Sequence, residues 1–171
     1  MNLYFDTFKT PLGDMTAGVT EAGDICLLDF SDCRDRSDLL LQRRFGSFVE
    51  KTRQNPQGIR DRVSDYFAGR KPHTAFHKLT LDTGGTPFQI SIWSALRQIP
   101  YGDAISYSQL AARVSAPRAA RAAGTANGQN PVAIIVPCHR VIAKNGTLAG
   151  YAGGVWRKQW LLDHERGAAS L

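Results

Sequence analysis

Three adjacent residues, Cys138, His139 and Arg140, carry the side chains of this sequence that are best suited to nucleophilic chemistry. An imidazole and a guanidinium beside a thiol favour the thiolate, which is the nucleophilic form of cysteine. Successive side chains on an extended segment point to opposite sides, so we expect His139 to take the proton of Cys138 through a bridging water rather than directly. The alternative is that Cys138 is only a small buried hydrophobe, as cysteines often are.

The segment before Cys138 must hold the thiol in place. Residues 133–136 are apolar without alternation, a pattern that predicts a short strand buried on both faces. Pro137 ends this strand, because proline lacks a backbone N–H and fixes φ. The sequence therefore predicts a thiol at the mouth of a rigid core element.

The composition is that of a globular protein whose thiols are kept reduced. The chain has 171 residues, 43% of them hydrophobic, and no apolar segment approaches the roughly 18 residues that span a bilayer. Its three cysteines cannot all pair, and no signal peptide is evident, so we expect a cytoplasmic protein without membrane contacts. The spacing of Cys26, Cys33, His73 and His77 matches no ligand pattern, and we expect no metal and no cofactor.

The formal net charge of +6 is concentrated in the second half of the chain. Residues 1–80 contain 12 Lys and Arg against 11 Asp and Glu, whereas residues 81–171 contain 9 against 4. The basic half is the one that carries Cys138. This asymmetry indicates a polyanionic partner, such as nucleic acid, for that half.

The first half, residues 1–81, has the pattern of a small structural α/β domain. The predicted elements are strands at 3–8, 15–19, 25–30 and 76–81 and helices at 39–45 and from Pro56 to the stop at Gly69. The first three strands are expected to form an antiparallel meander. No cluster of reactive side chains occurs here, so we assign this half no chemistry.

Residues 82–85 are interpreted as a linker, and a second domain is expected over 86–171. Its first helix begins at Thr86-Pro87, with Phe88, Ile92, Leu96 and Ile99 as its apolar face. Ser106 and Gln109 form a capping-box pattern that opens a short helix. A tight turn and a second helix over 118–127 follow, which together predict a helix-turn-helix.

The second of these helices consists mostly of very small side chains. Such a helix offers few groups that could read base edges in a major groove. Small residues let the backbone approach either a minor groove or a tightly packed neighbour. Arg118, Arg121 and Thr125 share one face of this helix and are its candidate polar contacts.

Two further features follow Cys138. Residues 150–154, Gly-Tyr-Ala-Gly-Gly, form a glycine-rich loop that is able to approach a ligand closely. A last helix is expected from about Val155 to Glu165, and it places Glu165 on the same face as Leu161 and Leu162. A carboxylate on an apolar face needs a partner, and His139 is the natural candidate, unless Glu165 turns out to solvent at a frayed helix end.

The second half closely resembles the O6-alkylguanine-DNA alkyltransferase family, the methylated-DNA–protein-cysteine methyltransferases, and in particular the bacterial Ogt-like type. The matching motifs are Ser106-Tyr107, residues 119–122, Asn130-Pro131, Pro-Cys-His-Arg-Val at 137–141, Gly-Tyr-Ala-Gly-Gly at 150–154, Trp160-Leu161-Leu162 and His164-Glu165. The resemblance implies direct-reversal DNA repair. The alkyl group of O6-alkylguanine, or of O4-alkylthymine, would be transferred irreversibly to Cys138 in a single turnover.

The resemblance also implies roles for the site residues. The implied catalytic residues are Cys138, His139, Glu165 and Asn130, with Glu165 orienting His139 and Asn130 holding the active-site turn. The implied base pocket is formed by Val141, Tyr151, Ala152 and Gly153. The implied DNA-binding residues are Tyr107, Arg118, Arg121, Thr125 and Arg140, with Arg121 filling the gap left by the extruded base and Tyr107 pressing on the rotated phosphate.

The partner implied by the resemblance is double-stranded DNA carrying an alkylated guanine. It would be bound by a monomer through the minor groove and independently of sequence. The implied fold is α+β with two domains. A small ribonuclease-H-like N-terminal domain precedes a mostly helical, winged helix-turn-helix-like domain that carries the cysteine. Some relatives have serine where this chain has Ala152, so only backbone donors can serve the lesion oxygen there.

Two other functions are compatible with the residues alone. The first is a helix-turn-helix DNA-binding regulator in which Cys138 is merely structural. The second is an amide hydrolase that turns over repeatedly on a Cys-His-Glu set. The three functions differ in stoichiometry, because only the repair protein modifies itself once and stops.

Overall fold

The computed structural model describes residues 1–167, and the chain divides into two compact units, Met1–Gly84 and Gly85–Leu171. The predicted end of the second domain, at residue 171, lies outside the described residues. Within residues 1–167, no helix has both the length and the apolar character needed to cross a membrane. Each unit has its own secondary structure and is described separately.

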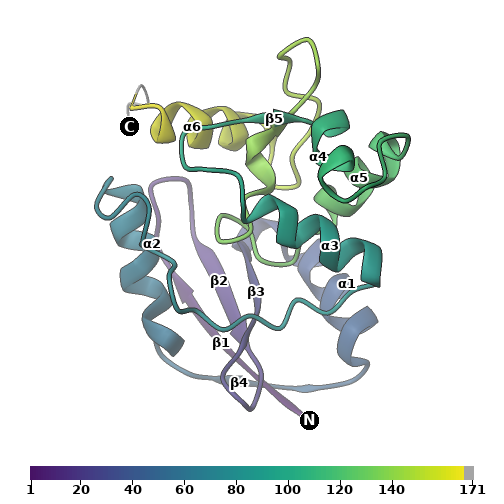
Figure 1. The fold of residues 1–171 in the computed structure, drawn as a ribbon. Helices are drawn as coiled ribbons and strands as arrows, with labels where there is room; N and C mark the ends of the chain where they lie inside the picture. Colours follow the sequence, from purple (N-terminus) through teal and green to yellow (C-terminus); the bar gives the residue numbers. More distant parts are fainter. Residues whose placement is uncertain (168–171) are drawn as a thin grey trace. The chain divides into compact units, whose positions relative to one another are not determined.

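Unit 1 is built on a four-stranded sheet with the strand order β3-β2-β1-β4 (Figure 1). The strands are β1 (Asn2–Phe8), β2 (Met15–Val19), β3 (Ile25–Phe30) and β4 (Val49–Thr52). The predicted antiparallel meander of β1, β2 and β3 is confirmed, whereas β4, which pairs parallel with β1, was not predicted. All four residues of β4 are exposed, so the strand carries no hydrophobic alternation that the sequence could reveal.

Two helices complete unit 1, α1 (Arg34–Phe45) and α2 (Ile59–Phe67). The helix predicted to start at Pro56 begins at Ile59, and its residues Ile59, Val63, Tyr66 and Phe67 are all buried. The Asn55 side chain accepts a hydrogen bond from the Arg60 backbone N–H at 2.8 Å, which satisfies one donor of the first turn of α2. The α1 helix begins five residues earlier than the predicted start at residue 39.

The strand predicted at 76–81 is wrong. Residues 72–78 form turns, and Leu81 makes only an isolated bridge to Ile25. The Arg62 guanidinium donates to the carbonyl oxygens of Ala75 and His77, at 3.0 and 2.8 Å. These carbonyls are therefore satisfied by a side chain rather than by a neighbouring strand.

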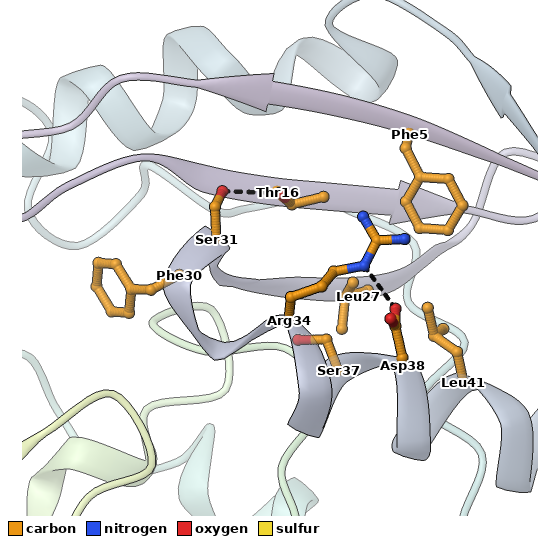
Figure 2. Close-up of a pocket in the computed structure, with 9 residues that line it drawn as sticks. All are labelled: Phe5, Thr16, Leu27, Phe30, Ser31, Arg34, Ser37, Asp38 and Leu41. Carbon is orange, nitrogen blue, oxygen red and sulfur yellow. Dashed lines mark hydrogen bonds and ion pairs between the residues drawn. The ribbon is translucent and has the colours of Figure 1, made fainter.

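A small pocket of unit 1 lies between α1 and the sheet (Figure 2). Its floor and walls are largely aromatic and aliphatic, with Phe5, Leu27 and Leu41 among the lining residues. Its charged groups neutralise one another, since Arg34 pairs with Asp38 at 2.6 Å and with Glu50 at 2.7 Å. The two charged residues that line the pocket, Arg34 and Asp38, are thus paired with each other.

Unit 2 is mostly helical, as predicted (Figure 1). Its elements are α3 (Pro87–Leu96), β5 (Ile105–Ser106), α4 (Tyr107–Arg113), α5 (Ala120–Gly128), a 3-10 turn η3 (Cys138–Arg140), β6 (Val141–Ile142) and α6 (Val155–Glu165). The predicted capping box of α4 is confirmed, and α3, whose start at Thr86-Pro87 was predicted, has a capping box as well. Thr86 and Gln89 open α3, and Ser106 and Gln109 open α4. The helix predicted at 118–127 begins only at Ala120, which leaves Arg118 in the preceding turn.

A short parallel pairing of β5 and β6 brings two distant segments together. Ile105 lies opposite Val141, and Ser106 lies opposite Ile142. Because β5 leads directly into Tyr107 and β6 follows directly on Arg140, the pairing places the start of α4 near the turn that carries Cys138. The winged helix-turn-helix thus positions the candidate site.

Candidate active site

The apolar segment before Cys138 is buried but is not a strand, so this prediction was wrong. Residues 133–135 form a turn in which the Val136 N–H donates to the Val132 carbonyl at 3.0 Å and the Ile135 N–H to the Ala133 carbonyl at 2.8 Å. Ile134 has a positive φ of 69°, a conformation that costs a β-branched residue on the order of 1–3 kcal/mol. Local hydrogen bonds replace a sheet ladder here, and periodicity cannot distinguish the two.

Asn130 holds this buried turn together. Its side-chain amide donates to the Val136 carbonyl at 2.7 Å, and its side-chain oxygen accepts from the Val132 N–H at 2.9 Å. Asn127 of α5 donates to the Cys138 carbonyl at 3.2 Å. Two buried amides therefore fix the backbone on both sides of the thiol, and the placement of Asn130 supports the predicted role.

Cys138 lies in the 3-10 turn η3 and not on an extended segment. The expectation of alternating side chains for Cys138 and His139 therefore rested on the wrong backbone geometry. Cys138 is 7% exposed, so the residue is buried without being sealed from the surface. A negative charge on Cys138 acts on two neighbours. Burial raises the pKa of Tyr107, and the Cys138 charge raises it further. Burial lowers the pKa of Lys158, and the Cys138 charge opposes this shift.

His139 and Glu165 form the pair that the sequence predicted. His139 Nε2 lies 2.8 Å from Glu165 Oε1, and both side chains are completely buried. Burial lowers the pKa of His139, helped by the nearby charges of Arg140 and Lys158 and opposed by Glu165. Burial opposes ionisation of Glu165, but His139 and Arg140 outweigh it and hold the pKa of Glu165 well below its usual range. The pair is thus a neutral imidazole beside a carboxylate.

This charge state fixes the histidine tautomer. A carboxylate can only accept hydrogen bonds, so His139 Nε2 must carry the proton. His139 Nδ1 is then left with a lone pair, and it is buried with no hydrogen-bond partner among the described residues. A neutral imidazole with an acceptor nitrogen is the form that a general base requires.

Arg140, predicted to bind DNA, is turned inward instead. Its guanidinium donates to Glu165 Oε2 from Nε at 2.9 Å and to Glu165 Oε1 from Nη2 at 2.7 Å. A third bond runs from Nη1 to the Ile99 carbonyl at 2.8 Å, and the side chain is only 11% exposed. The structure therefore brings Arg140 to the pair of His139 and Glu165.

Lys158 is a residue that sequence reasoning missed. It is completely buried in α6, and its ammonium donates to the Gly150 carbonyl at 3.0 Å and lies 5.8 Å from the centre of the Tyr107 ring. Burial lowers the pKa of Lys158, while the charge of Cys138 raises it. The sequence did contain a signal for the burial of Lys158. The residue lies one turn before Leu161 and Leu162 on the apolar face of α6, where a lysine is either buried or extends its ammonium to solvent.

The glycine-rich loop is tied to the start of α6. Arg157 donates to the Gly153 carbonyl at 3.0 Å, and Lys158 holds Gly150 as described above. Of the predicted pocket residues, Val141 and Gly153 are buried, Tyr151 is partly buried and Ala152 is exposed. The loop therefore presents backbone and one small side chain to its surroundings, which suits close approach of a planar ligand.

The small residues of α5 serve two surfaces. Ala123 and Ala126 are buried, and the Trp93 indole of α3 donates to the Ala126 carbonyl at 2.9 Å, so one face is tightly packed. On the other side, α5 and the start of α3 line a surface groove. The groove is lined by Thr86, Phe88, Gln89, Arg118, Ala119, Arg121, Ala122, Thr125, Ala126 and Gln129. The predicted contacts Arg118, Arg121 and Thr125 are all exposed there.

Residues 1–167 contain no group of three or more His, Cys, Asp or Glu side chains that could hold a metal ion. The site brings together a thiol, an imidazole, one carboxylate paired with a guanidinium, and a buried ammonium.

Comparison with known proteins gives the class to which this fold belongs, a DNA-binding methyltransferase. Residues 87–167 match the family described as 6-O-methylguanine DNA methyltransferase, DNA binding domain. The methylated-DNA–protein-cysteine methyltransferase of Salmonella typhimurium is 46% identical over 167 residues, covering 96% of each chain. The corresponding protein of Methanosarcina barkeri is 38% identical and covers 95% of this chain and 97% of its own.

Solved structures show the same similarity over both units. A crystal structure of Mycobacterium tuberculosis OGT in complex with DNA superposes with a TM-score of 0.81 at 36% identity, covering 99% of this chain and 95% of that one. The Mycobacterium tuberculosis O6-methylguanine methyltransferase gives a TM-score of 0.77 at the same identity, covering 98% and 95%. The chain belongs to the methylated-DNA–protein-cysteine methyltransferase family. The family resemblance and the two-domain α+β fold class predicted from the sequence are thereby confirmed.

The Asn130 clamp gives a direct test of how the thiol is positioned. Replacing Asn130 by Ala leaves the buried Val132 N–H without a partner and removes one of the two donors to the Val136 carbonyl, which keeps only the Cys138 N–H. The free energy of unfolding in urea titrations should fall by roughly 2 kcal/mol. Asn145→Ala, in the exposed turn at 144–146, is the matched control and should cost less than about 1 kcal/mol. Equal losses in the two variants would show that Asn130 does not hold the turn.

Proposed function

We propose that Cys138 is the residue that accepts the alkyl group in the family reaction. The protein is a methylated-DNA–protein-cysteine methyltransferase that repairs DNA by direct reversal, and the regulator alternative is not favoured. The observation that supports Cys138 is its position in the buried turn beside His139, which is paired with Glu165 at 2.8 Å. Cys26 is buried among apolar residues instead, where burial and Asp82 raise its pKa to about 12.

The reaction begins with removal of the thiol proton. A bridging water carries this proton to His139 Nδ1, while Glu165 holds Nε2 and balances the resulting positive charge. The thiolate then attacks the alkyl carbon. The S–C bond forms as the O6–C bond breaks, the electron pair of that bond returns to the base, and the base takes up a proton. Guanine is restored, and Cys138 becomes a thioether.

Each molecule reacts once. Removal of the alkyl group would require displacement at its carbon with the Cys138 thiolate as leaving group, and a thiolate leaves poorly from an unactivated thioether. The irreversible, stoichiometric transfer predicted from the resemblance follows from this chemistry.

The substrate is an alkylated guanine in duplex DNA, bound by a monomer through the minor groove and without sequence preference. Since every proposed catalytic residue comes from unit 2 of one chain, no second copy is needed to complete the site. Small residues along α5 allow its backbone to approach a groove, and Arg118 and Arg121 are exposed to contact DNA. The lesion must be extruded from the stack, at a cost of a few kcal/mol, to reach a thiol that is only 7% exposed.

The identity of the acceptor is tested by mass spectrometry after incubation with a duplex containing O6-methylguanine. The wild type should gain one methyl group on the Cys138 peptide and then stop. Cys138→Ala should lose transfer completely and still bind DNA, whereas Cys33→Ser, at the partly exposed cysteine of unit 1, should react normally. Repeated turnover would instead support a hydrolase, and transfer by Cys138→Ala would overturn the assignment.

Arg121 is expected to act in base extrusion. Arg121→Ala should slow repair of a duplex on the order of 10-fold or more and leave reaction with free O6-benzylguanine unchanged, because only the duplex requires an extruded base. Arg113→Ala, at the end of α4, is the matched control and should react like the wild type. Equal slowing of the duplex and free-base reactions by Arg121→Ala would contradict a role in extrusion.

Lys158 is expected to stabilise the thiolate. Lys158→Met should lower the rate with the free base on the order of 10-fold to 100-fold near neutral pH, and the loss should shrink as pH rises, since the thiolate then forms without the ammonium. Lys144→Met, at an exposed turn, should have no effect. A loss of the same size at every pH would show that Lys158 acts only in packing.

A further inference from the structure

We infer that Arg140 is a positioning residue of the transfer reaction, which locks the Glu165 carboxylate so that His139 keeps its proton on Nε2 and offers Nδ1 as the base. This inference rests on the proposed role of Cys138 as the acceptor. It assigns Arg140 to the chemistry rather than to DNA.

The geometry of the guanidinium supports this assignment. Two nitrogens of Arg140 reach the two oxygens of Glu165, at 2.9 Å and 2.7 Å, in a bidentate arrangement that fixes the plane of the carboxylate. Glu165 Oε1 also lies 2.8 Å from His139 Nε2. The imidazole and the guanidinium therefore share one carboxylate oxygen, and rotation of the carboxylate would break all of these contacts.

A second anchor holds Arg140 itself. Its Nη1 donates to the Ile99 carbonyl at 2.8 Å, and the guanidinium lies 5.7 Å from the centre of the Tyr101 ring. Both partners belong to the connection between α3 and β5, so the orientation of the catalytic carboxylate depends on a third segment of unit 2. With three of its nitrogens engaged inside the protein, Arg140 has little capacity left for a phosphate.

The charge of Arg140 matters as well as its shape. Arginine cannot lose its proton in a protein, so Glu165 beside it remains an acceptor and never donates to His139. Several charged or titratable groups surround this imidazole. Glu165 and Lys158 reach it from α6, Arg140 and Cys138 flank it in η3, and Tyr101 lies over the Arg140 guanidinium. Among these groups Glu165 favours the imidazolium, and Arg140 opposes it.

Removal of the Arg140 charge should therefore raise the pKa of His139. A protonated His139 cannot accept the thiol proton, so transfer should fail at a higher pH than in the wild type. With free O6-benzylguanine, Arg140→Met should react on the order of 10-fold more slowly than the wild type near pH 6, and the deficit should shrink toward pH 8.5. Arg140→Lys keeps the charge and one donor and should recover part of the rate.

Three further measurements keep the test decisive. Imidazole nitrogen NMR of His139 should show the Nε2-protonated tautomer in the wild type and a raised pKa in Arg140→Met, even if that variant transfers no alkyl group. Thermal unfolding separates loss of the site from loss of the fold, and exposed Arg97→Met is the matched control with a normal pH profile. Binding to unmodified duplex should be unchanged in Arg140→Met.

The outcomes separate this inference from the proposed function. An unchanged pH profile and His139 tautomer in Arg140→Met would overturn the positioning role. A loss confined to duplex repair and DNA affinity would return Arg140 to DNA binding. Failure of the wild type to alkylate Cys138 would instead refute the proposed acceptor.

Discussion

The buried carboxylate of Glu165 is the constraint on which the arrangement of unit 2 depends. An ionised carboxylate with no exposed surface is stable only when its oxygens are bonded, and here an imidazole and a bidentate guanidinium supply those bonds. Glu165 belongs to α6 and both of its partners belong to η3, and one of these partners, Arg140, is held in turn by the Ile99 carbonyl. These three segments are far apart in the sequence. Because each group satisfies another, the end of α6 and the thiol-bearing turn cannot shift independently of one another.

A second constraint acts on the backbone. The turn at 132–136 is apolar and buried, so its amide and carbonyl groups must be paired, and the Asn130 side chain together with local bonds achieves this without a neighbouring strand. The strained Ile134 shows that the turn is held in a conformation its own residues do not prefer. The position of Cys138 is therefore imposed by the surrounding structure, as preorganised reactive groups require.

These two constraints also explain what the sequence could and could not reveal. Amphipathic periodicity and capping residues located α2, α3, α4 and α6, because those signals are local. The Glu165 and His139 pair was accessible for a related reason, since an acid on an apolar face demands a partner. The segment 133–136 was wrongly predicted as a strand, because a buried strand and a buried turn have the same apolar sequence pattern. The Asn130 side chain, which supplies hydrogen bonds in place of a neighbouring strand, lies outside this segment. The burial of Arg140 and Lys158 was not predicted, because cationic side chains are normally exposed and only tertiary contacts reveal an exception.

The contrast between Cys138 and Cys26 shows why burial alone does not make a thiol reactive. Both are buried, but around Cys26 burial and Asp82 disfavour the thiolate, whereas Cys138 lies within reach of the Lys158 ammonium and beside an imidazole held as a base. Burying an ammonium, a guanidinium and an imidazole in one site is costly unless each has a hydrogen-bond partner. Lys158 accordingly donates to the Gly150 carbonyl, Arg140 donates to Glu165 and the Ile99 carbonyl, and His139 pairs with Glu165. A protein that reacts only once need not release the alkyl group from this site. Rigid surroundings of the thiol are therefore compatible with its function, whereas a turnover enzyme would also need a route by which the modified cysteine could be freed.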